Sequence, residues 1–244
     1  MTKTIYSVLD RTYGFGDFIR GSIQLAYLAK KNGVQFRMNL NNHPLHSFFA
    51  HVEPKKSDMI FYMHYGLQPE DHLVNLVEHL STSKLQEMYV STNFFYDKES
   101  IDQELKEKLN KMLEFHEQYQ RVETPVQQYE VLHIRTSDDD YIHFDRLVER
   151  VRTLNLGPNT IVISSDYETK RKLHETFGFH FLETQPVHTA FTEDTTVLEN
   201  TVKDYVILSK SQRTHCFSFY EHGSGFSEQC SFLHNIPYTK EIIN

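Results

Sequence analysis

The sequence of 244 residues predicts an α/β protein of two Rossmann-like domains, each with a parallel sheet, that face a cleft. Two observations lead to this fold class. Short apolar strand patterns alternate with helical patterns, the order typical of parallel sheets covered on both faces. The patterns form two blocks separated by a polar segment at 122–128, which contains Pro125 and which we interpret as a linker. We therefore expect an N-terminal domain at 1–125 and a C-terminal domain at 126–244.

The N-terminal block opens with a β-α-β unit. A short apolar run is followed by a glycine turn and then by apolar residues at helical spacing. Lys30 and Lys31 suit the last turn of this helix, because cations complement the helix dipole, and Gly33 suits the position after its end. The patterns of this block predict strands at 4–9, 34–40, 59–63 and 88–92, and helices at 19–31, 70–80 and 100–119.

The C-terminal block alternates more regularly. Gly178 follows a helical pattern and is typical of a helix end, while Thr196 and Glu199 match the spacing of a capping box. The patterns of this block predict strands at 131–134, 160–164, 179–182 and 213–218, and helices at 144–154, 168–177, 196–209 and 228–233. In sheets of this kind, ligands bind at the carboxyl ends of the strands.

Composition excludes several classes of protein. A formal net charge of -8 argues against a nucleic-acid binder, which would carry a basic surface. The two cysteines give no disulfide framework, and the 15 histidines show no zinc-binding spacing. The start of the chain does not match a signal peptide, and no stretch reaches the roughly 20 apolar residues of a membrane span. We expect a cytoplasmic protein without a membrane span.

The first candidate site is the turn that contains Gly14, Gly16 and Asp17, together with Arg20. Glycines at a strand-to-helix turn allow a ligand to approach the backbone, and the helix start offers free N–H groups. Ile19 stands where the dinucleotide-binding fingerprint requires a third glycine, so a nicotinamide enzyme is poorly supported. An equally simple interpretation is a glycine turn with Asp17 as the helix cap.

The second candidate site is His133 and Arg135. Two residues apart on a strand, they point to the same face of the sheet, and Arg135 offers a fork of donors that matches phosphate geometry. A structural salt bridge from Arg135 to one of Asp138–Asp140 is the alternative. The three aspartates also allow a metal site, although a solvated turn explains adjacent carboxylates as well.

Two further candidates follow later strands. Ser165 and Asp166 either hold the ribose or base of a nucleotide or cap the next helix. The small residues at 223–227 suit a phosphate cradle at a helix start, or a plain tight turn. Lesser candidates are the loop residues His188 and Thr189, which we expect to line the cleft, and the helical Asp204. The cradle residues that we assign to donor binding are Ser224, Gly225, Phe226 and Ser227.

Taken in order, these segments resemble the GT-B fucosyltransferase superfamily, which includes the α1,2- and α1,6-fucosyltransferases and the protein O-fucosyltransferases. GFGDFIRG looks like the first loop of that family, VLHIRTSDD resembles its H-x-R motif, and TIVISSDYETKRKL resembles its next strand and acidic turn. DYVILSKSQRTHCFSF, followed by GSGFSEQCSFL, resembles its last donor-binding motif. The resemblance covers residues 1–35 and 130–238. Thr136 and Ser137 stand where the family often carries a second arginine.

The resemblance implies roles for the candidates. Arg135 would bind the β-phosphate of a nucleotide sugar, His133 would shape the same pocket, and Asp166 and Asp204 would lie near the nucleoside. The cradle at 224–227 would wrap the pyrophosphate. The N-terminal residues Gly14, Gly16, Asp17 and Arg20 would approach from across the cleft, with Asp17 as our candidate for the general base.

The expected reaction is therefore transfer of a sugar, first of all fucose from GDP-fucose, to a hydroxyl of a glycan or small acceptor. We expect inversion, with no metal and no cofactor besides the donor substrate. Two alternatives remain open from the sequence. One is a metal-dependent nucleotide or phosphosugar hydrolase that uses Asp138–Asp140, and the other is a non-catalytic nucleotide-binding module.

Overall fold

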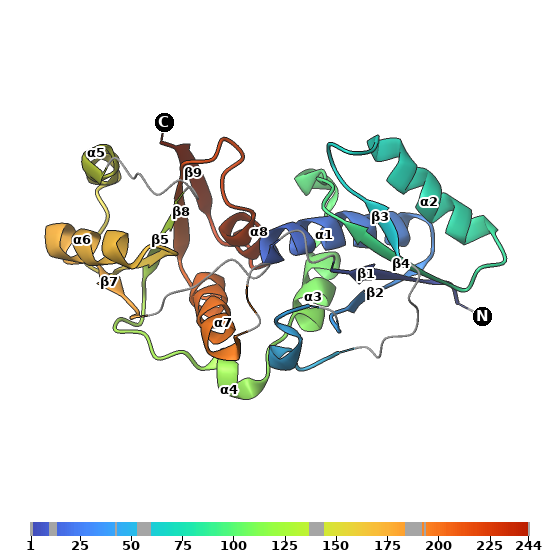
Figure 1. Cartoon of the computed structure of the whole chain (residues 1–244), viewed down its shortest axis with the longest axis horizontal. Helices are drawn as coiled ribbons and strands as arrows, with labels where there is room; N and C mark the ends of the chain where they lie inside the picture. Colours follow the sequence, from blue (N-terminus) through green and yellow to red (C-terminus); the bar gives the residue numbers. More distant parts are fainter. Residues whose placement is uncertain are drawn as a thin grey trace. The chain divides into compact units, whose positions relative to one another are not determined.

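The computed structural model of the chain describes residues 2–9, 14–41, 43–52, 60–136, 144–183, 192 and 194–243. The chain forms two compact units, Met1–His116 and Glu117–Asn244, and each unit has its own parallel sheet (Figure 1). The fold is therefore the α/β fold with parallel sheets that the sequence predicts.

The first unit contains a parallel sheet in the order β2-β1-β4-β3. In register, Thr4 of β1 lies opposite Gln35 of β2 on one side and opposite Glu87 of β4 on the other. The central strand β1 is thus paired with segments far apart in the sequence. The elements are β1 (Thr4–Val8), α1 (Phe15–Lys31), β2 (Gln35–Asn39), β3 (Phe61–Met63), α2 (Glu70–Thr82), β4 (Glu87–Thr92) and α3 (Gln103–Met112), with short 3-10 turns at His46–Phe48 and Lys98–Ser100.

Helix α1 packs very closely on this sheet. A Cβ atom added to Gly21 would lie 1.7 Å from the carbonyl oxygen of Thr92, so the helix backbone touches the end of β4. The buried hydroxyls of Ser7 and Ser22 are 2.7 Å apart and link β1 to the same helix. These contacts hold the N-terminus of α1 at the carboxyl edge of the sheet.

The second unit contains a parallel sheet in the order β7-β6-β5-β8-β9. Numbered within the unit, this is the order 3-2-1-4-5 of a Rossmann fold, so the topological switch point lies between β5 and β8. The elements are α4 (Glu117–Gln120), β5 (Glu130–Arg135), α5 (Phe144–Thr153), β6 (Thr160–Ser164), α6 (Tyr167–Phe177), β7 (His180–Phe181), α7 (Thr195–Ser209), β8 (Arg213–Ser218), α8 (Gly225–Leu233) and β9 (Tyr238–Ile242).

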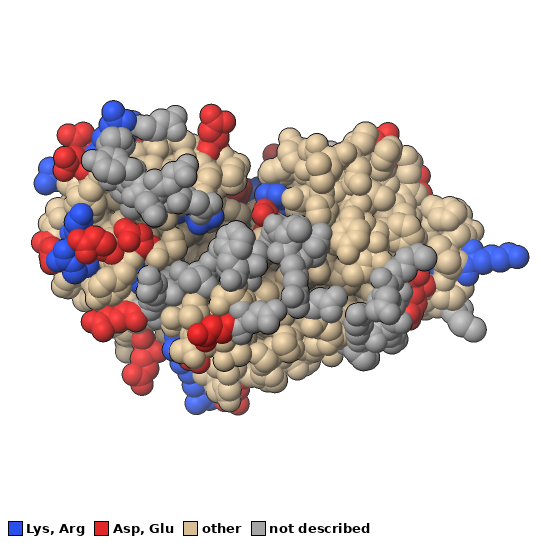
Figure 2. All heavy atoms as spheres, viewed as in Figure 1, with Lys and Arg blue, Asp and Glu red and all other residues tan. Residues whose placement is uncertain are grey.

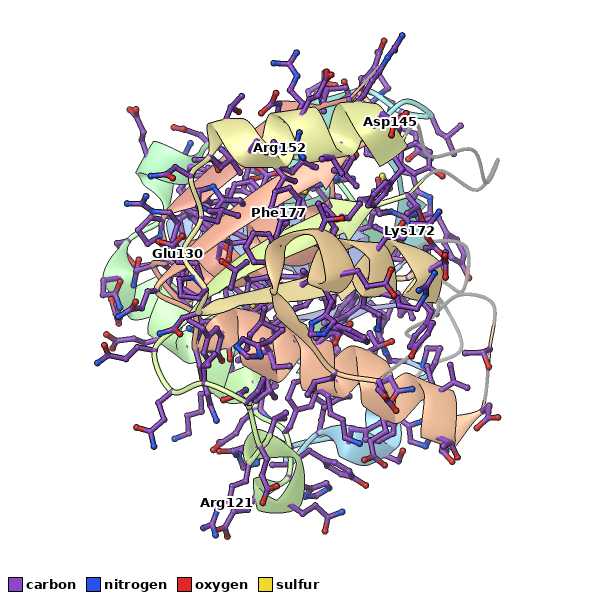
Figure 3. The ribbon with its side chains drawn as sticks, turned by 90° about the vertical axis from the view of Figure 1, so that its left-hand side faces the viewer. Arg121, Glu130, Asp145, Arg152, Lys172 and Phe177 are labelled. Atoms are coloured by element: carbon purple, nitrogen blue, oxygen red, sulfur yellow. The ribbon has the colours of Figure 1, made fainter. Side chains whose placement is uncertain are left out.

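The two faces of β5 meet different helices. Leu132 and Ile134 point into an apolar core that includes Leu147 of α5 and Leu173 of α6. Figure 3 looks onto α5 and α6, which lie side by side on this face, with Asp145 and Arg152 on α5 and Lys172 on α6. His133, which lies between Leu132 and Ile134 in the sequence, points to the opposite face of the sheet, where it contacts α8. This alternation is the one predicted for the second candidate site.

One long helix was predicted where the chain has two short ones. The apolar pattern over 100–119 predicts a continuous helix, but α3 ends at Met112 and α4 begins at Glu117. The interruption is explained by pairing with a distant segment: the N–H of His116 donates to the carbonyl of Phe48 at 2.9 Å, and Phe115 stacks on Phe49. Tertiary contacts therefore override the local periodicity.

Two details of the second unit also differ from the predictions. The capping box expected at Thr196 and Glu199 is wrong, because Asp194 is the N-cap of α7 and accepts from the N–H of Thr196 at 2.9 Å. Strand β9 was not predicted; it pairs with β8 at the edge of the sheet and has mostly polar residues. A polar edge strand carries little of the alternation by which strands are found.

The expectations for cysteines and for the membrane can be compared directly with the structure. Cys216 and Cys230 are both free and buried, as small apolar side chains would be. Among the described residues, no helix is both long enough and apolar enough to cross a bilayer.

Candidate functional site

The candidate site of the second unit lies at the switch point of its sheet. Strands β5 and β8 end together here, since Arg135 is in register with Ser218. The N–H of Phe219, just after β8, donates to the carbonyl of Arg135 at 3.2 Å. Because parallel strands carry their ligand sites outside their carboxyl ends, this edge is where a ligand of the unit is expected.

Arg135 presents its guanidinium group to this edge. The group lies over the ring of Tyr220, with 5.1 Å between the guanidinium carbon and the ring centroid. No carboxylate among the described residues forms a salt bridge with Arg135, whereas Asp138–Asp140, the alternative partners, lie outside the described residues. The guanidinium group carries five N–H donors in a fork that matches the oxygens of a phosphate.

His133 connects β5 to the helix that follows the switch point. It is buried, and its Nδ1 lies 2.8 Å from the hydroxyl of Ser227 and 3.9 Å from the sulfur of Cys216. Burial, and to a lesser extent the charge of Arg135, lowers the pKa of His133 to about 3. The imidazole is therefore neutral near pH 7, and it holds the first turn of α8 against β5.

The start of α8 lies beside β5, where the Ser227 hydroxyl meets His133. Ser224 is the N-cap, but its side chain does not cap the helix. The amides of Gly225, Phe226 and Ser227 have no acceptor within the helix, and the helix dipole favours an anion at this end. The preceding turn is closed by Gly223, whose φ of 80° is in the left-handed region and whose N–H donates to the carbonyl of Tyr220 at 2.9 Å. The four predicted cradle residues are thus contiguous at one helix start.

The ends of β5 and β6 are linked by hydroxyls. Thr136, at the end of β5, has its Oγ1 3.0 Å from the Oγ of Ser165, just after β6. Asp166 accepts from the N–H groups of Glu168 and Thr169, so its carboxylate serves as the N-cap of α6. The structural alternative that the sequence left open for Asp166 is therefore realised in this conformation.

Asp204, on α7, is buried near a lysine. Burial raises its pKa to about 7, an effect that the nearby charge of Lys170 opposes. Lys170 is itself buried on α6, and its ammonium donates to the carbonyl of Leu182, just after β7, at 3.1 Å. The charges of both Asp204 and Asp166 act on Lys170, so these side chains gather near the carboxyl ends of β6 and β7.

The first unit holds the other predicted residues at the start of α1. Gly14 is the N-cap, and Gly16 and Asp17 lie in the first turn. A carboxylate oxygen of Asp17 is 3.0 Å from Nη2 of Arg20. The Nε of Arg20 donates to the carbonyl of Asn93 at 2.9 Å.

His188 and Thr189, the remaining predicted cleft residues, lie outside the described residues.

Sequence reasoning missed three residues of this region in the second unit. Tyr220 lies under the Arg135 guanidinium, Thr136 bonds to Ser165, and Lys170 reaches the end of β7. Thr136 is the first residue after β5 and Tyr220 is the second after β8, and this position beside the switch point was the available signal. Over the described part of the chain, no group of three or more His, Cys, Asp or Glu side chains is placed to hold a metal ion; Asp138–Asp140 fall outside that part.

Comparison with known proteins shows what the fold resembles. No family model matches the chain, and no curated protein sequence matches it. Among solved structures, a mutant of FUT1 from Arabidopsis thaliana in complex with GDP has a TM-score of 0.65 and 11% identity, over 98% of this chain and 70% of that one. Fucosyltransferase NodZ from Bradyrhizobium has a TM-score of 0.59 and 10% identity, over 96% of this chain and 93% of that one.

A second structure of NodZ, an α-1,6-fucosyltransferase soaked with GDP-fucose, has a TM-score of 0.57 and 10% identity, over 96% of this chain and 93% of that one. The chain therefore has the α/β fold of GT-B fucosyltransferases, as its sequence motifs predict. The alignment with FUT1 covers 98% of this chain, so the likeness includes both compact units.

Proposed function

We propose that this protein is an inverting glycosyltransferase that moves fucose from GDP-fucose to an acceptor hydroxyl, without a metal ion or other cofactor. The observation that carries the proposal is the position of both Arg135 and the first turn of α8 beside the switch point of the sheet. Its fold neighbours support the donor, since FUT1 was solved with GDP and NodZ was soaked with GDP-fucose.

The diphosphate of the donor fits this end of the sheet. The first-turn amides of α8 suit its oxygens, and Arg135 adds a charged fork of donors on the β5 side. Tyr220 supports the guanidinium from below, at 5.1 Å. Because His133 is neutral and bonded to Ser227, the cradle keeps its shape without adding a buried charge.

The nucleoside end is assigned to Asp204 and Asp166. The Watson–Crick edge of guanine carries two adjacent N–H donors, and a carboxylate offers two matching acceptor oxygens. Asp204 is buried and has a pKa raised to about 7, so a guanine that hydrogen-bonds its ionised form would favour loss of its proton. Asp166 remains the N-cap of α6 and borders the same edge of the sheet.

The chemistry is a displacement at the anomeric carbon. The acceptor oxygen forms a bond to this carbon as the bond to the β-phosphate oxygen breaks, and GDP leaves with the bonding electrons. The acceptor proton goes to Asp17, the general base in this proposal. Arg135 and the α8 amides oppose the negative charge that grows on the leaving diphosphate, and this stabilisation is in place before reaction.

Thermal unfolding with GDP, UDP, ADP, CDP and dTDP, each with and without magnesium, tests the donor site. We expect GDP to raise the melting temperature, because a ligand at a hundred times its dissociation constant stabilises the folded state by about 2.7 kcal/mol. Arg135→Ala should abolish this rise. The matched control is Arg152→Ala, on the exposed face of α5 (Figure 3); in this variant GDP should still raise the melting temperature. No rise with any nucleotide would reject the donor site.

Turnover separates the three candidate functions. Release of GDP from GDP-fucose that depends on an added acceptor, and that continues in EDTA, supports a metal-independent transferase. Release of the nucleotide or of phosphate to water that stops in EDTA would support the hydrolase instead. Nucleotide binding without turnover of any donor would support a binding module.

A further inference from the structure

The first unit exposes several large apolar side chains near the carboxyl ends of β3 and β4. The exposed fraction is 60% for Tyr65, 47% for Phe95 and 79% for Leu67. The loop after β3 and the segment after β4 run side by side here (Figure 1). Contiguous exposed apolar groups at a ligand-binding edge mark a site of recognition more often than scattered ones.

Two of these rings form a defined surface, which we call the Tyr65–Phe95 platform. The ring centroids of Tyr65 and Phe95 are 4.9 Å apart at an angle of 84°. The guanidinium carbon of Arg20 lies 4.2 Å from the centroid of Phe95, and Arg20 is paired with Asp17. The rings thus adjoin a carboxylate and a guanidinium at the start of α1.

Asn93 holds the platform in position. Its side-chain oxygen accepts from the backbone N–H of Tyr65 at 2.8 Å, and its carbonyl accepts from Nε of Arg20 at 2.9 Å. Asn93 therefore ties the loop after β3, the segment after β4 and helix α1 together. A surface ordered before binding loses less conformational entropy when a ligand arrives.

We propose that the Tyr65–Phe95 platform binds a ring of a neutral oligosaccharide, with the sugar face on the aromatic rings and its hydroxyls on Asp17 and Arg20. A pyranose has a flat face of C–H groups and a rim of hydroxyls, each of which donates and accepts. The platform offers the matching arrangement: apolar faces beside one anionic acceptor and one cationic donor. This proposal rests on the proposed function in one respect, that the bound sugar belongs to the acceptor.

The charge near the platform favours a neutral sugar. Asp17 and Arg20 neutralise each other, and the protein as a whole has a formal charge of -8, which disfavours an acidic glycan. On the face shown in Figure 2, the N-terminal unit carries few Lys, Arg, Asp or Glu side chains. A proline-rich peptide also packs on aromatic grooves, so it becomes an arm of the test.

The experiment measures binding without any donor. Cellotetraose, chitotetraose, β-1,4-mannotetraose and β-1,4-galactotetraose are titrated into the full chain by calorimetry and by saturation-transfer NMR. We expect at least one to bind, with saturation strongest on the C–H groups of one ring face. Phe95→Ala and Tyr65→Ala should each weaken it about tenfold or more, while Phe95→Tyr and Tyr65→Phe should retain it.

The controls exclude loss of folding and of the donor site. Leu85→Ala removes a side chain that is 46% exposed before β4, at the opposite edge of the sheet, and should leave sugar binding unchanged. The bond from Tyr65 to Asn93 uses the backbone, so ring truncation does not remove it. The GDP-induced rise in melting temperature should persist in Phe95→Ala.

The outcomes of the two proposals can be told apart. Sugar binding without any nucleotide effect would uphold the platform and reject the donor site, and the reverse result would reject the platform alone. The platform is also rejected if no tetrasaccharide binds, if binding survives both alanine variants, or if a decaproline peptide binds in a ring-dependent way and the sugars do not.

Discussion

Gly21 has no room for a side chain, and this sets how closely α1 approaches β4. A Cβ atom at this position would meet the carbonyl oxygen and carbon of Thr92 and the backbone nitrogen of Asn93. Asn93 is also the residue that orders Tyr65 and Arg20. The glycine therefore has a packing role that bears on the surface beside it.

Gly21→Ala should lower the free energy of unfolding by about 1–3 kcal/mol, because backbone atoms must move to admit the methyl group. Urea unfolding followed by circular dichroism measures the change. Gly157→Ala is the control: an added Cβ meets nothing within 4 Å there, and the backbone is not left-handed. Equal stability of the Gly21 variant and the wild type would show that α1 shifts freely.

Asp17 is half-exposed and ion-paired, which holds its carboxylate in one orientation at the start of α1. If it accepts the acceptor proton, Asp17→Asn should lower kcat by a factor of about 10² to 10⁴ and leave the dissociation constant of GDP within about twofold. Steady-state kinetics and nucleotide titration check the two halves of this expectation. Unchanged turnover would remove Asp17 from the role of base.

Single residues show how far sequence reasoning reaches. It placed His133 and Arg135 on one face of a strand because the two-residue period of a strand is geometric, and His133 does contact α8 there. It could not foresee that Tyr220 lies against Arg135 or that Phe95 lies against Arg20. Both rings belong to irregular segments, whose conformation no periodicity describes.

At the scale of elements, the bond between His133 and Ser227 joins β5 to α8. The imidazole in this bond is neutral near pH 7, because burial lowers the pKa of His133 to about 3. Protonation would place a charge among Ser227, Cys216 and the start of a helix, whose dipole also disfavours a cation. The junction of strand and helix is therefore sensitive to acid.

The pH dependence of stability tests this junction. Between about pH 6.5 and 3, the unfolded chain binds a proton at His133 that the folded chain does not, so the free energy of unfolding falls as the pH falls. His133→Asn has no imidazole to take up this proton. Between pH 6.5 and 4.5, its free energy of unfolding should therefore fall by about 2 kcal/mol less than that of the wild type. Urea unfolding at each pH measures both.

Two comparisons complete this test. The raised pKa of Asp204 has the opposite effect on stability, because the folded protein gains a proton there as the pH falls below about 7. This contribution is the same in the wild type and in His133→Asn, so it cancels in the comparison. The control is His72→Asn, on the exposed surface of α2, whose free energy of unfolding should fall with pH as much as that of the wild type. Parallel curves for wild type and His133→Asn would contradict a neutral, buried His133.

Elements were predictable where burial imposed a period. Strands β5 to β8 and helices α5, α6 and α7 are found close to their expected bounds, because each presents a regular apolar face. The break between α3 and α4 was not predictable, since it is made by pairing of His116 with Phe48. The edge strand β9 was not predicted because little of it is buried, so its sequence shows no apolar period.

At the scale of the whole molecule, the order of motifs carried more information than any one of them. The glycine turn, the H-x-R strand and the small-residue helix start each have a plain structural interpretation, and Asp166 is in fact a helix cap. Their sequence along the chain nevertheless indicated a fold that the solved structures share at 10–11% identity. The acceptor could not be inferred in this way, because residues 60–98, which carry the platform, follow no shared motif.

The pairing of β1 between β2 and β4 has a consequence for synthesis on the ribosome. Thr4 finds one partner at Gln35 soon after it emerges, but the other, Glu87, is translated much later. Until then, one edge of a largely apolar strand is open, and the growing chain is exposed to aggregation. The second unit repeats the delay, since β5 waits for β8. Slower translation before β4 or β8 would lengthen that exposure, whereas a chaperone that covers the open edge would shorten it.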